Sequence, residues 1–155
     1  MRGEVSIHID APPERVWSLV SDVIRMGNWS PVCYRCEWVG GAAGPSEGAR
    51  FRGYNKQGLA RWWTECEITE CDSPRLFEFR TIDGLLNVGY HNREMTRWRY
   101  ELEPEGAGTK LTESYELVSF PYLLRPLAPV LRRQNRESGM RTTLERLKSE
   151  AEAAP

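Results

Sequence analysis

The chain has 155 residues, of which 21 are basic and 22 acidic, giving a net charge of −1. This length and an apolar content of 40% are typical of one globular domain, so we expect residues 1–155 to form a single domain. The balanced charge argues against nucleic acid as a partner, because binding phosphates requires a basic excess. The longest run without a charged residue is nine residues, too short for a membrane span. No secretory signal opens the chain, and we expect a cytoplasmic protein.

The N-terminal region predicts one strand and two short helices. Residues 4–10 alternate between apolar and polar side chains, which is typical of a half-buried strand. Pro12, Pro13 and Glu14 then favour the start of a helix, because proline and an acidic residue are both suited to a first helical turn. A second short helical segment is expected to end near Trp29, before Ser30-Pro31.

From residue 32 the apolar period changes to two. It predicts six strands, around residues 34–38, 51–55, 62–69, 77–81, 96–102 and 111–117. Alternation of this kind indicates an antiparallel sheet with one face in water and one face covered. A helix predicted over residues 129–152 supplies the cover. Its inner stripe follows helical spacing and consists of Val130, Arg133, Glu137, Met140, Leu144, Leu147 and Ala151.

This order of elements resembles the START-like superfamily, also called SRPBCC, and within it the bacterial polyketide cyclase/dehydrase-like proteins. The resemblance rests on residues 7–17, 21–22, 29–31, 98–104, 108–112 and 143–148. It implies an α+β helix-grip fold: a seven-stranded curved antiparallel sheet wrapped around a long C-terminal helix, with two short helices after the first strand. It also implies a cavity between sheet and helix that holds a hydrophobic small molecule.

Many aromatic and polar side chains fall on the expected inner face, where they either line such a pocket or form ordinary core. The candidate ligand-binding residues are Tyr34, Phe51, Asn55, Trp62, Thr64, Cys66, Phe79, Glu94, Trp98, Tyr100, Glu113, Tyr115, Arg133 and Glu137.

Charged residues on the inner face indicate a ligand site more specifically than the aromatic residues do, because a buried charge requires a partner, water or a ligand. Arg133 and Glu137 either pair with each other or contact the ligand, and we expect Arg133 to hold a ligand oxygen. Glu94 and Glu113, expected on adjacent strands, are candidates for acid/base chemistry, together with His91.

Cys33 and Cys36 have zinc-like spacing, but strand alternation places positions i and i+3 on opposite faces. We therefore expect the four cysteines (Cys33, Cys36, Cys66 and Cys71) to bind no metal and to form no disulfide.

Three functions remain open. The first is binding of an apolar or aromatic small molecule that is polyketide-like or lipid-like. The second is a polyketide aromatase/cyclase that uses polar cavity residues for aldol condensation and dehydration, and the third is a partner-binding module that exposes an apolar patch, for which Trp63 is a candidate. No cofactor is expected, since the glycines lack the spacing of a phosphate-binding loop. The oligomeric state stays open.

Overall fold

The computed structural model describes residues 1–84, 94–119, 126 and 136–153. Its elements are, in chain order, β1 (Arg2–Ile9), α1 (Pro13–Val20), the 3-10 helix η1 (Val23–Asn28), β2 (Cys33–Val39), β3 (Arg50–Gln57), β4 (Ala60–Asp72), β5 (Leu76–Gly84), β6 (Thr96–Glu105), β7 (Gly108–Leu117) and α3 (Arg136–Glu152). The predicted order of strand, two short helices, six strands and C-terminal helix is confirmed. Residues 129–135 of the predicted helix lie outside the described residues.

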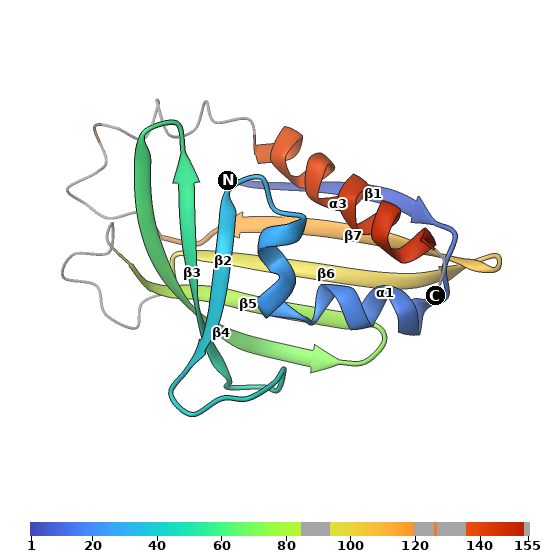
Figure 1. Cartoon of the computed structure of the whole chain (residues 1–155), viewed down its shortest axis with the longest axis horizontal. Coiled ribbons are helices and arrows are strands. Elements are labelled where there is room, and N and C mark those ends of the chain that lie inside the picture. Colours follow the sequence, from blue (N-terminus) through green and yellow to red (C-terminus); the bar gives the residue numbers. More distant parts are fainter. Residues whose placement is uncertain (85–93, 120–125, 127–135, 154–155) are drawn as a thin grey trace.

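The strands form one antiparallel sheet in the order β1-β7-β6-β5-β4-β3-β2. The sheet curves strongly, so that the β3–β4 hairpin stands steeply against β6 and β7 (Figure 1). The register of β4 against β5 shifts at Glu65/Cys66 and again at Ile68/Glu70. Shifts of this kind bend and twist a strand, which explains how the 13-residue β4 follows the curve.

The helices cover one face of the sheet, which we call the inner face; the opposite face is the outer face. α3 lies over β1 and β7, with α1 beside it (Figure 1). The buried residues of α3 are Met140, Thr143, Leu144, Leu147 and Ala151, so the apolar half of the predicted stripe is confirmed. Burial of this stripe is what holds the helix, because its mean composition is polar.

An aromatic cluster fills the core between α1 and the middle strands. Trp17 of α1 meets Phe77 edge to face, with ring centroids 6.0 Å apart, and the contacts continue from Phe77 through Phe79 and Phe51 to Trp38. Phe79 and Phe51 lie at 5.2 Å, within the range in which aromatic pairs stabilise beyond their buried area. These rings connect α1 with β5, β3 and β2.

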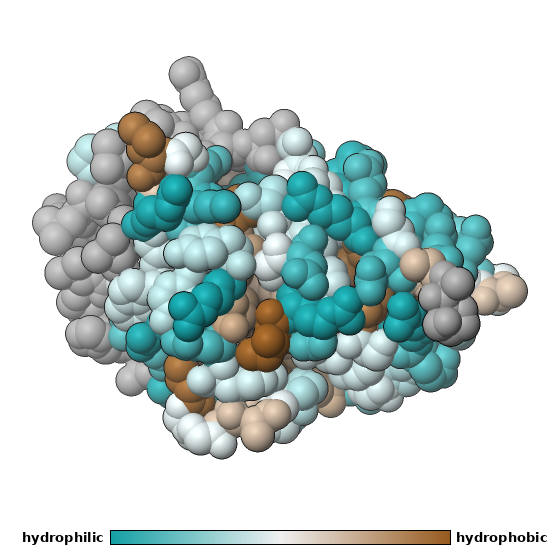
Figure 2. Space-filling model, viewed as in Figure 1, coloured by the Kyte–Doolittle hydropathy of each residue, from teal (hydrophilic) through white to brown (hydrophobic). Residues whose placement is uncertain are grey.

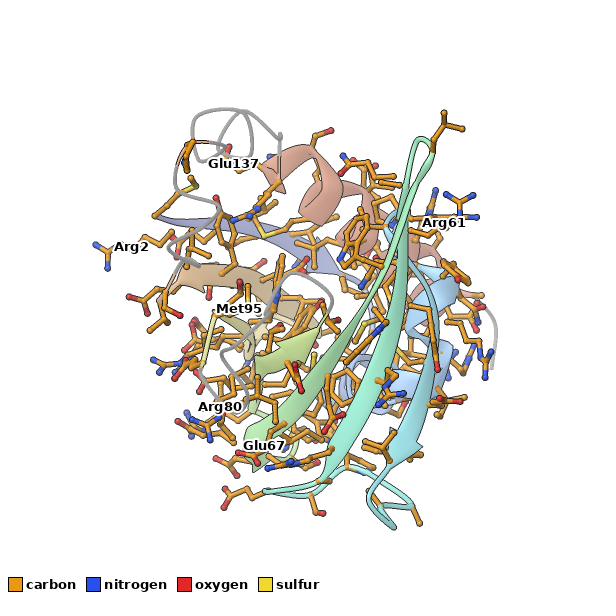
Figure 3. The ribbon with its side chains drawn as sticks, turned by 90° about the vertical axis from the view of Figure 1, so that its left-hand side faces the viewer. Arg2, Arg61, Glu67, Arg80, Met95 and Glu137 are labelled. Carbon is orange, nitrogen blue, oxygen red and sulfur yellow. The ribbon has the colours of Figure 1, made fainter. Side chains whose placement is uncertain are left out.

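Arginine and glutamate side chains cover much of the outer face. Glu67 contacts Arg80 at 2.8 Å and Arg50 at 3.2 Å, and Glu78 contacts Arg99 at 2.9 Å. Glu67 and Arg80 lie together there (Figure 3).

The side of the molecule that carries the helices is also polar at its surface. Hydrophilic residues dominate the view in Figure 2, where hydrophobic residues show only in separate small areas. Within the described ranges, no helix is long and apolar enough to cross a membrane.

A bulge in β2 changes which side chains face inward. Cys33 pairs with Asn55, but the next pair is Arg35 with Tyr54, so Tyr34 is the extra residue. Because the extra residue offsets the alternation, Cys33 and Cys36 both lie on the inner face and their Sγ atoms are 3.4 Å apart. The expectation that these two cysteines point to opposite faces is wrong.

Candidate functional site

A buried carboxyl group lies on the inner face, on β7 next to the edge strand β1. Leu111, Glu113 and Tyr115 of β7 are all buried on this face, as their alternation predicts. Glu113 is opposite Tyr100 of β6, and the Tyr100 hydroxyl donates a hydrogen bond of 2.9 Å to Glu113 Oε1. Oε2 of Glu113 is buried and has no hydrogen-bond partner among the described residues. Within the described residues, this oxygen therefore has hydrogen-bonding capacity that is not used.

Burial controls the protonation of this pair. Desolvation raises the pKa of Glu113 to about 8, although the hydrogen bond from Tyr100 acts in the opposite direction. Burial, and then the nearby Glu113, raise the pKa of Tyr100 well above its usual range. At neutral pH Glu113 is thus mainly a neutral carboxylic acid, which can donate a proton as well as accept a hydrogen bond.

Arg136, at the start of α3, places a cation beside the same strands. Its guanidinium lies over the ring of Tyr115, with Cζ 5.2 Å from the ring centroid. Tyr115 in turn contacts Trp98 of β6 at 5.6 Å between centroids. The Nη1 atom of Arg136 is buried without a hydrogen-bond partner in the described parts of the chain. The site thus combines an aromatic surface, an unpaired donor and a carboxyl group.

The β3–β4 hairpin supplies a second, polar stretch of the inner face. Asn55 Nδ2 donates a hydrogen bond of 3.3 Å to Thr64 Oγ1. Trp62, which pairs with Asn55 in the register, is half-buried on the same face. The structure therefore places the predicted residues Asn55, Trp62 and Thr64 together.

Phe51, Phe79 and Cys66 also face inward, but they are packed in the core. The two phenyl rings belong to the aromatic cluster, and Cys66 is fully surrounded, with its sulfur 3.8 Å from Thr81 Oγ1. Of the two interpretations left open for the aromatic residues, ordinary core fits Phe51 and Phe79.

Three predicted site residues lie away from this inner-face site: Tyr34, Glu94 and Glu137. Tyr34 is 45% exposed, because the bulge turns it outward, and Lys56 lies over its ring. Glu94 precedes β6, where alternation no longer applies, and it contacts Arg97 at 2.8 Å and Arg80 at 3.8 Å on the outer face. Glu94 and Glu113 are therefore on opposite faces and do not form a carboxyl pair.

Glu137 is exposed rather than buried in the inner stripe. It lies at the start of α3 (Figure 3), and its Oε1 is 3.5 Å from where a Cβ on Gly3 would stand. Arg133 and His91 lie outside the described residues.

Arg136 was not among the predicted site residues. A signal for it existed, because Arg136 is four residues before Met140 and therefore on the same face of the helix. The helical spacing instead predicts Arg133 as the cation of this stripe.

A groove of about 590 Å³ opens between the β3–β4 turn and the first half of α3. It is lined by Pro31, Val32, Lys56, Gln57, Gly58, Arg61, Ser138, Gly139 and Thr142. None of these is a predicted site residue. Arg61 stands at the hairpin end of this groove (Figure 3). Gly139 contributes to the space, since a Cβ there would meet only Pro31, at 3.8 Å.

Metal chemistry finds no support in the described parts of the chain, where no three His, Cys, Asp or Glu side chains are grouped to hold an ion. The four cysteines are free thiols.

Comparison with known proteins assigns the family. Residues 1–152 match the profile of the family described as polyketide cyclase / dehydrase and lipid transport. The chain belongs to this family. It is also similar to the polyketide-cyclase-like protein Cgl2372 from Corynebacterium glutamicum, with 32% identity over 97% of this chain and 85% of that one, at a TM-score of 0.53. A search of curated proteins finds no match.

Two further solved structures share the fold of the present chain. Protein CV1439 from Chromobacterium violaceum is 15% identical, with a TM-score of 0.69 over 99% of this chain and 98% of that one. The di-domain ARO/CYC StfQ from the steffimycin biosynthetic pathway is 12% identical, with a TM-score of 0.67 over 97% of this chain and 44% of that one. At these identities the likeness shows the helix-grip fold alone.

Proposed function

We propose that the protein binds an apolar or aromatic small molecule, polyketide-like or lipid-like, between the inner face of the sheet and α3. Glu113 and Arg136 hold a carbonyl or enol oxygen of this molecule, and Trp98 and Tyr115 contact its apolar body. The family, whose description includes lipid transport, supports a ligand of this class. Arg133 stays a candidate for the same site.

The observation that carries this proposal is that two buried polar atoms, Glu113 Oε2 and Arg136 Nη1, have no hydrogen-bond partner among the residues that the structure describes. A buried polar atom without a partner costs about 1–3 kcal/mol. A ligand oxygen that accepts hydrogen bonds from both groups removes this cost. Arg136 suits the task because its guanidinium stays charged and presents fixed donors.

A binding titration with matched variants tests the proposal. Tryptophan fluorescence would follow binding of a hydroxyanthraquinone, and anthracene would serve as the probe without oxygen atoms. Arg136→Ala should weaken hydroxyanthraquinone binding about tenfold, a loss of about 1.4 kcal/mol, and leave anthracene binding unchanged. Arg141→Ala, an exposed arginine on the same helix, is the control. Equal affinities of wild type and Arg136→Ala for the hydroxyanthraquinone would contradict the assignment.

Native mass spectrometry of protein purified from its source extends this test to the natural ligand. A co-purified oxygenated hydrophobic compound is expected, and it should be lost from Arg136→Ala but retained by Arg141→Ala. A co-purified hydrocarbon without polar oxygen would contradict the role of the two polar groups.

The protonated state of Glu113 favours a second candidate function, that of an aromatase/cyclase. A neutral carboxylic acid can protonate a ketone oxygen during aldol condensation, while Arg136 stabilises the enolate oxygen. In that case turnover of a poly-β-ketone should fall as the pH rises through about 8, because Glu113 then loses its proton. Glu113→Gln should abolish turnover while leaving product binding intact.

The outer face offers less support for a partner-binding module. Trp63 lies there half-buried, with the Arg52 guanidinium 4.6 Å above its ring, amid the arginine–glutamate contacts. As part of the proposal we place the protein in the cytoplasm, since free buried thiols are typical of a reducing compartment.

A further inference from the structure

The bulge in β2 creates a close pair of thiols on the inner face. Cys33 and Cys36 are both buried, and their sulfur atoms are 3.4 Å apart. The space for them is left by Gly53 of β3: a Cβ at this position would lie 3.4 Å from the Cys33 sulfur and 3.7 Å from the Cys36 sulfur. A Cβ there would make ordinary van der Waals contact with both sulfurs, so Gly53 faces the pair directly. The bulge in β2 therefore brings the two sulfurs into contact opposite Gly53 of β3.

We propose that Cys33 and Cys36 are an oxidisable dithiol, which a small hydroperoxide converts into a disulfide within β2. The sulfurs must close from 3.4 Å to a bond length of about 2 Å. The bulge makes this movement feasible, because its extra residue, Tyr34, is unpaired in the β2–β3 register. This inference does not depend on the ligand proposed above.

Cys33 is the sulfur that reacts first. Its contact with Cys36 lowers the pKa of the Cys33 thiol, whereas the same contact and burial raise the pKa of Cys36. The thiolate is the nucleophile in such reactions. The Cys33 thiolate attacks one peroxide oxygen and the O–O bond breaks. The departing oxygen takes up a proton, leaving a sulfenic acid on Cys33.

Cys36 completes the reaction. Its sulfur attacks the Cys33 sulfur, the S–O bond breaks, and the departing hydroxide combines with the Cys36 proton to form water. In total, two thiols and one hydrogen peroxide give one disulfide and two waters. Because Cys33 and Cys36 are 8% and 5% exposed, the oxidant must be small and uncharged, which favours a hydroperoxide over a bulky disulfide.

Cys66 is the competing third thiol. It also faces inward, but its sulfur contacts Thr81, and burial raises the pKa of Cys66 to about 12. Cys66 therefore neither contacts Cys33 as closely as Cys36 does nor ionises readily. The proposal predicts a Cys33–Cys36 bond in preference to a bond with Cys66.

Trypsin mapping of the full chain tests this prediction directly. Arg35 separates the two cysteines, so trypsin places Cys33 in residues 26–35 and Cys36 in residues 36–50, whereas Cys66 and Cys71 share residues 62–75. Reduced protein would be treated with hydrogen peroxide, alkylated under denaturing conditions and digested. We expect residues 26–35 and 36–50 to appear as one disulfide-linked pair in a protein that stays monomeric on a non-reducing gel. Dithiothreitol should reverse the link.

Single cysteine-to-serine variants identify which thiols form the disulfide. Cys33→Ser and Cys36→Ser should lose the linked pair, and the control Cys71→Ser should retain it. In Cys36→Ser the Cys33 sulfenic acid has no resolving thiol, so dimedone should label Cys33. If either serine variant fails to fold, the mapping of the wild type alone decides. The proposal is overturned by the absence of a linked pair, by a preferred link to residues 62–75, or by a link found only in dimers.

Discussion

Tyr100 and Glu113 face each other across β6 and β7, and the phenol donates a hydrogen bond to a carboxyl group that is itself almost fully buried. The folded protein therefore retains a proton at Glu113 that the unfolded chain releases. The burial of Glu113, whose effect exceeds that of the opposing hydrogen bond from Tyr100, connects the stability of the fold with the chemistry of the site.

The stability should depend on pH through Glu113. Burial raises its pKa from 4.5 to about 8, so the folded state binds more protons than the unfolded state between these values. The stabilisation is fully present below about pH 4.5 and is lost as the pH rises through about 8. Each pH unit within this window changes the free energy of unfolding by up to about 1.4 kcal/mol. Urea unfolding across the window measures the slope.

Glu113→Gln should flatten this slope, because glutamine keeps an oxygen to accept from Tyr100 but does not titrate. Glu137→Gln, which neutralises an exposed carboxylate, is the matched control and should retain the wild-type slope. Parallel profiles for wild type and Glu113→Gln would show that Glu113 is ionised in the folded protein.

Tyr100→Phe removes the only donor to Glu113 Oε1 among the described residues. A buried carboxyl oxygen left without its partner should lower the free energy of unfolding by about 1–3 kcal/mol. Since the hydrogen bond opposes the effect of burial, its loss should also raise the pKa of Glu113 further. Tyr54→Phe removes a similar bond of 2.7 Å to Glu37, but on the outer face, where water replaces it. Denaturation of both variants at pH 6 should show the larger loss for Tyr100→Phe.

Leu144→Ala tests the packing of α3 against the sheet. Leu144 is completely buried. Its truncation should lower the free energy of unfolding by about 2–5 kcal/mol through lost burial and the cavity left behind. The exposed neighbour Arg141→Ala should change the stability little. A loss below about 0.5 kcal/mol for Leu144→Ala would contradict the packing of this helix.

Gly27→Ala tests the contact between η1 and β2. A Cβ at this position would clash with the carbonyl oxygen of Tyr34, so the backbone of one of the two segments must move. Overpacking of this kind costs about 1–3 kcal/mol. Gly44→Ala, which meets no atom within 4 Å, is the control. Thermal unfolding should separate the two variants; equal midpoints would show that η1 adjusts freely.

Periodicity predicted most of the fold. The two-residue alternation located the strands, and the placement of Glu113 and Tyr115 on the inner face followed from it. The apolar residues of α3 likewise followed from helical spacing. These predictions succeed because side-chain direction in a regular element depends on position alone.

The errors arise where that regularity stops. The extra residue in β2 carries no sequence signal, because Cys33, Tyr34 and Cys36 are all acceptable on either face of a strand. Glu94 lies before β6, so alternation could not orient it, and the arginines that hold it come from two strands. Arg133 and Arg136 are three residues apart, a spacing that predicts one helical face for both, so spacing alone could not decide between them.

The pairing of β1 with β7 has a consequence for how the protein is made. β1 is an edge strand, and its register joins Arg2 to Glu116. On the ribosome, β1 therefore waits until β7 has been made before its backbone groups gain partners, and α3, which packs against β1, follows later still. Contacts between such distant segments slow folding, since the loop must close before the contact forms. Pairing of β1 thus requires that all of the strands from β2 to β7 have been made first.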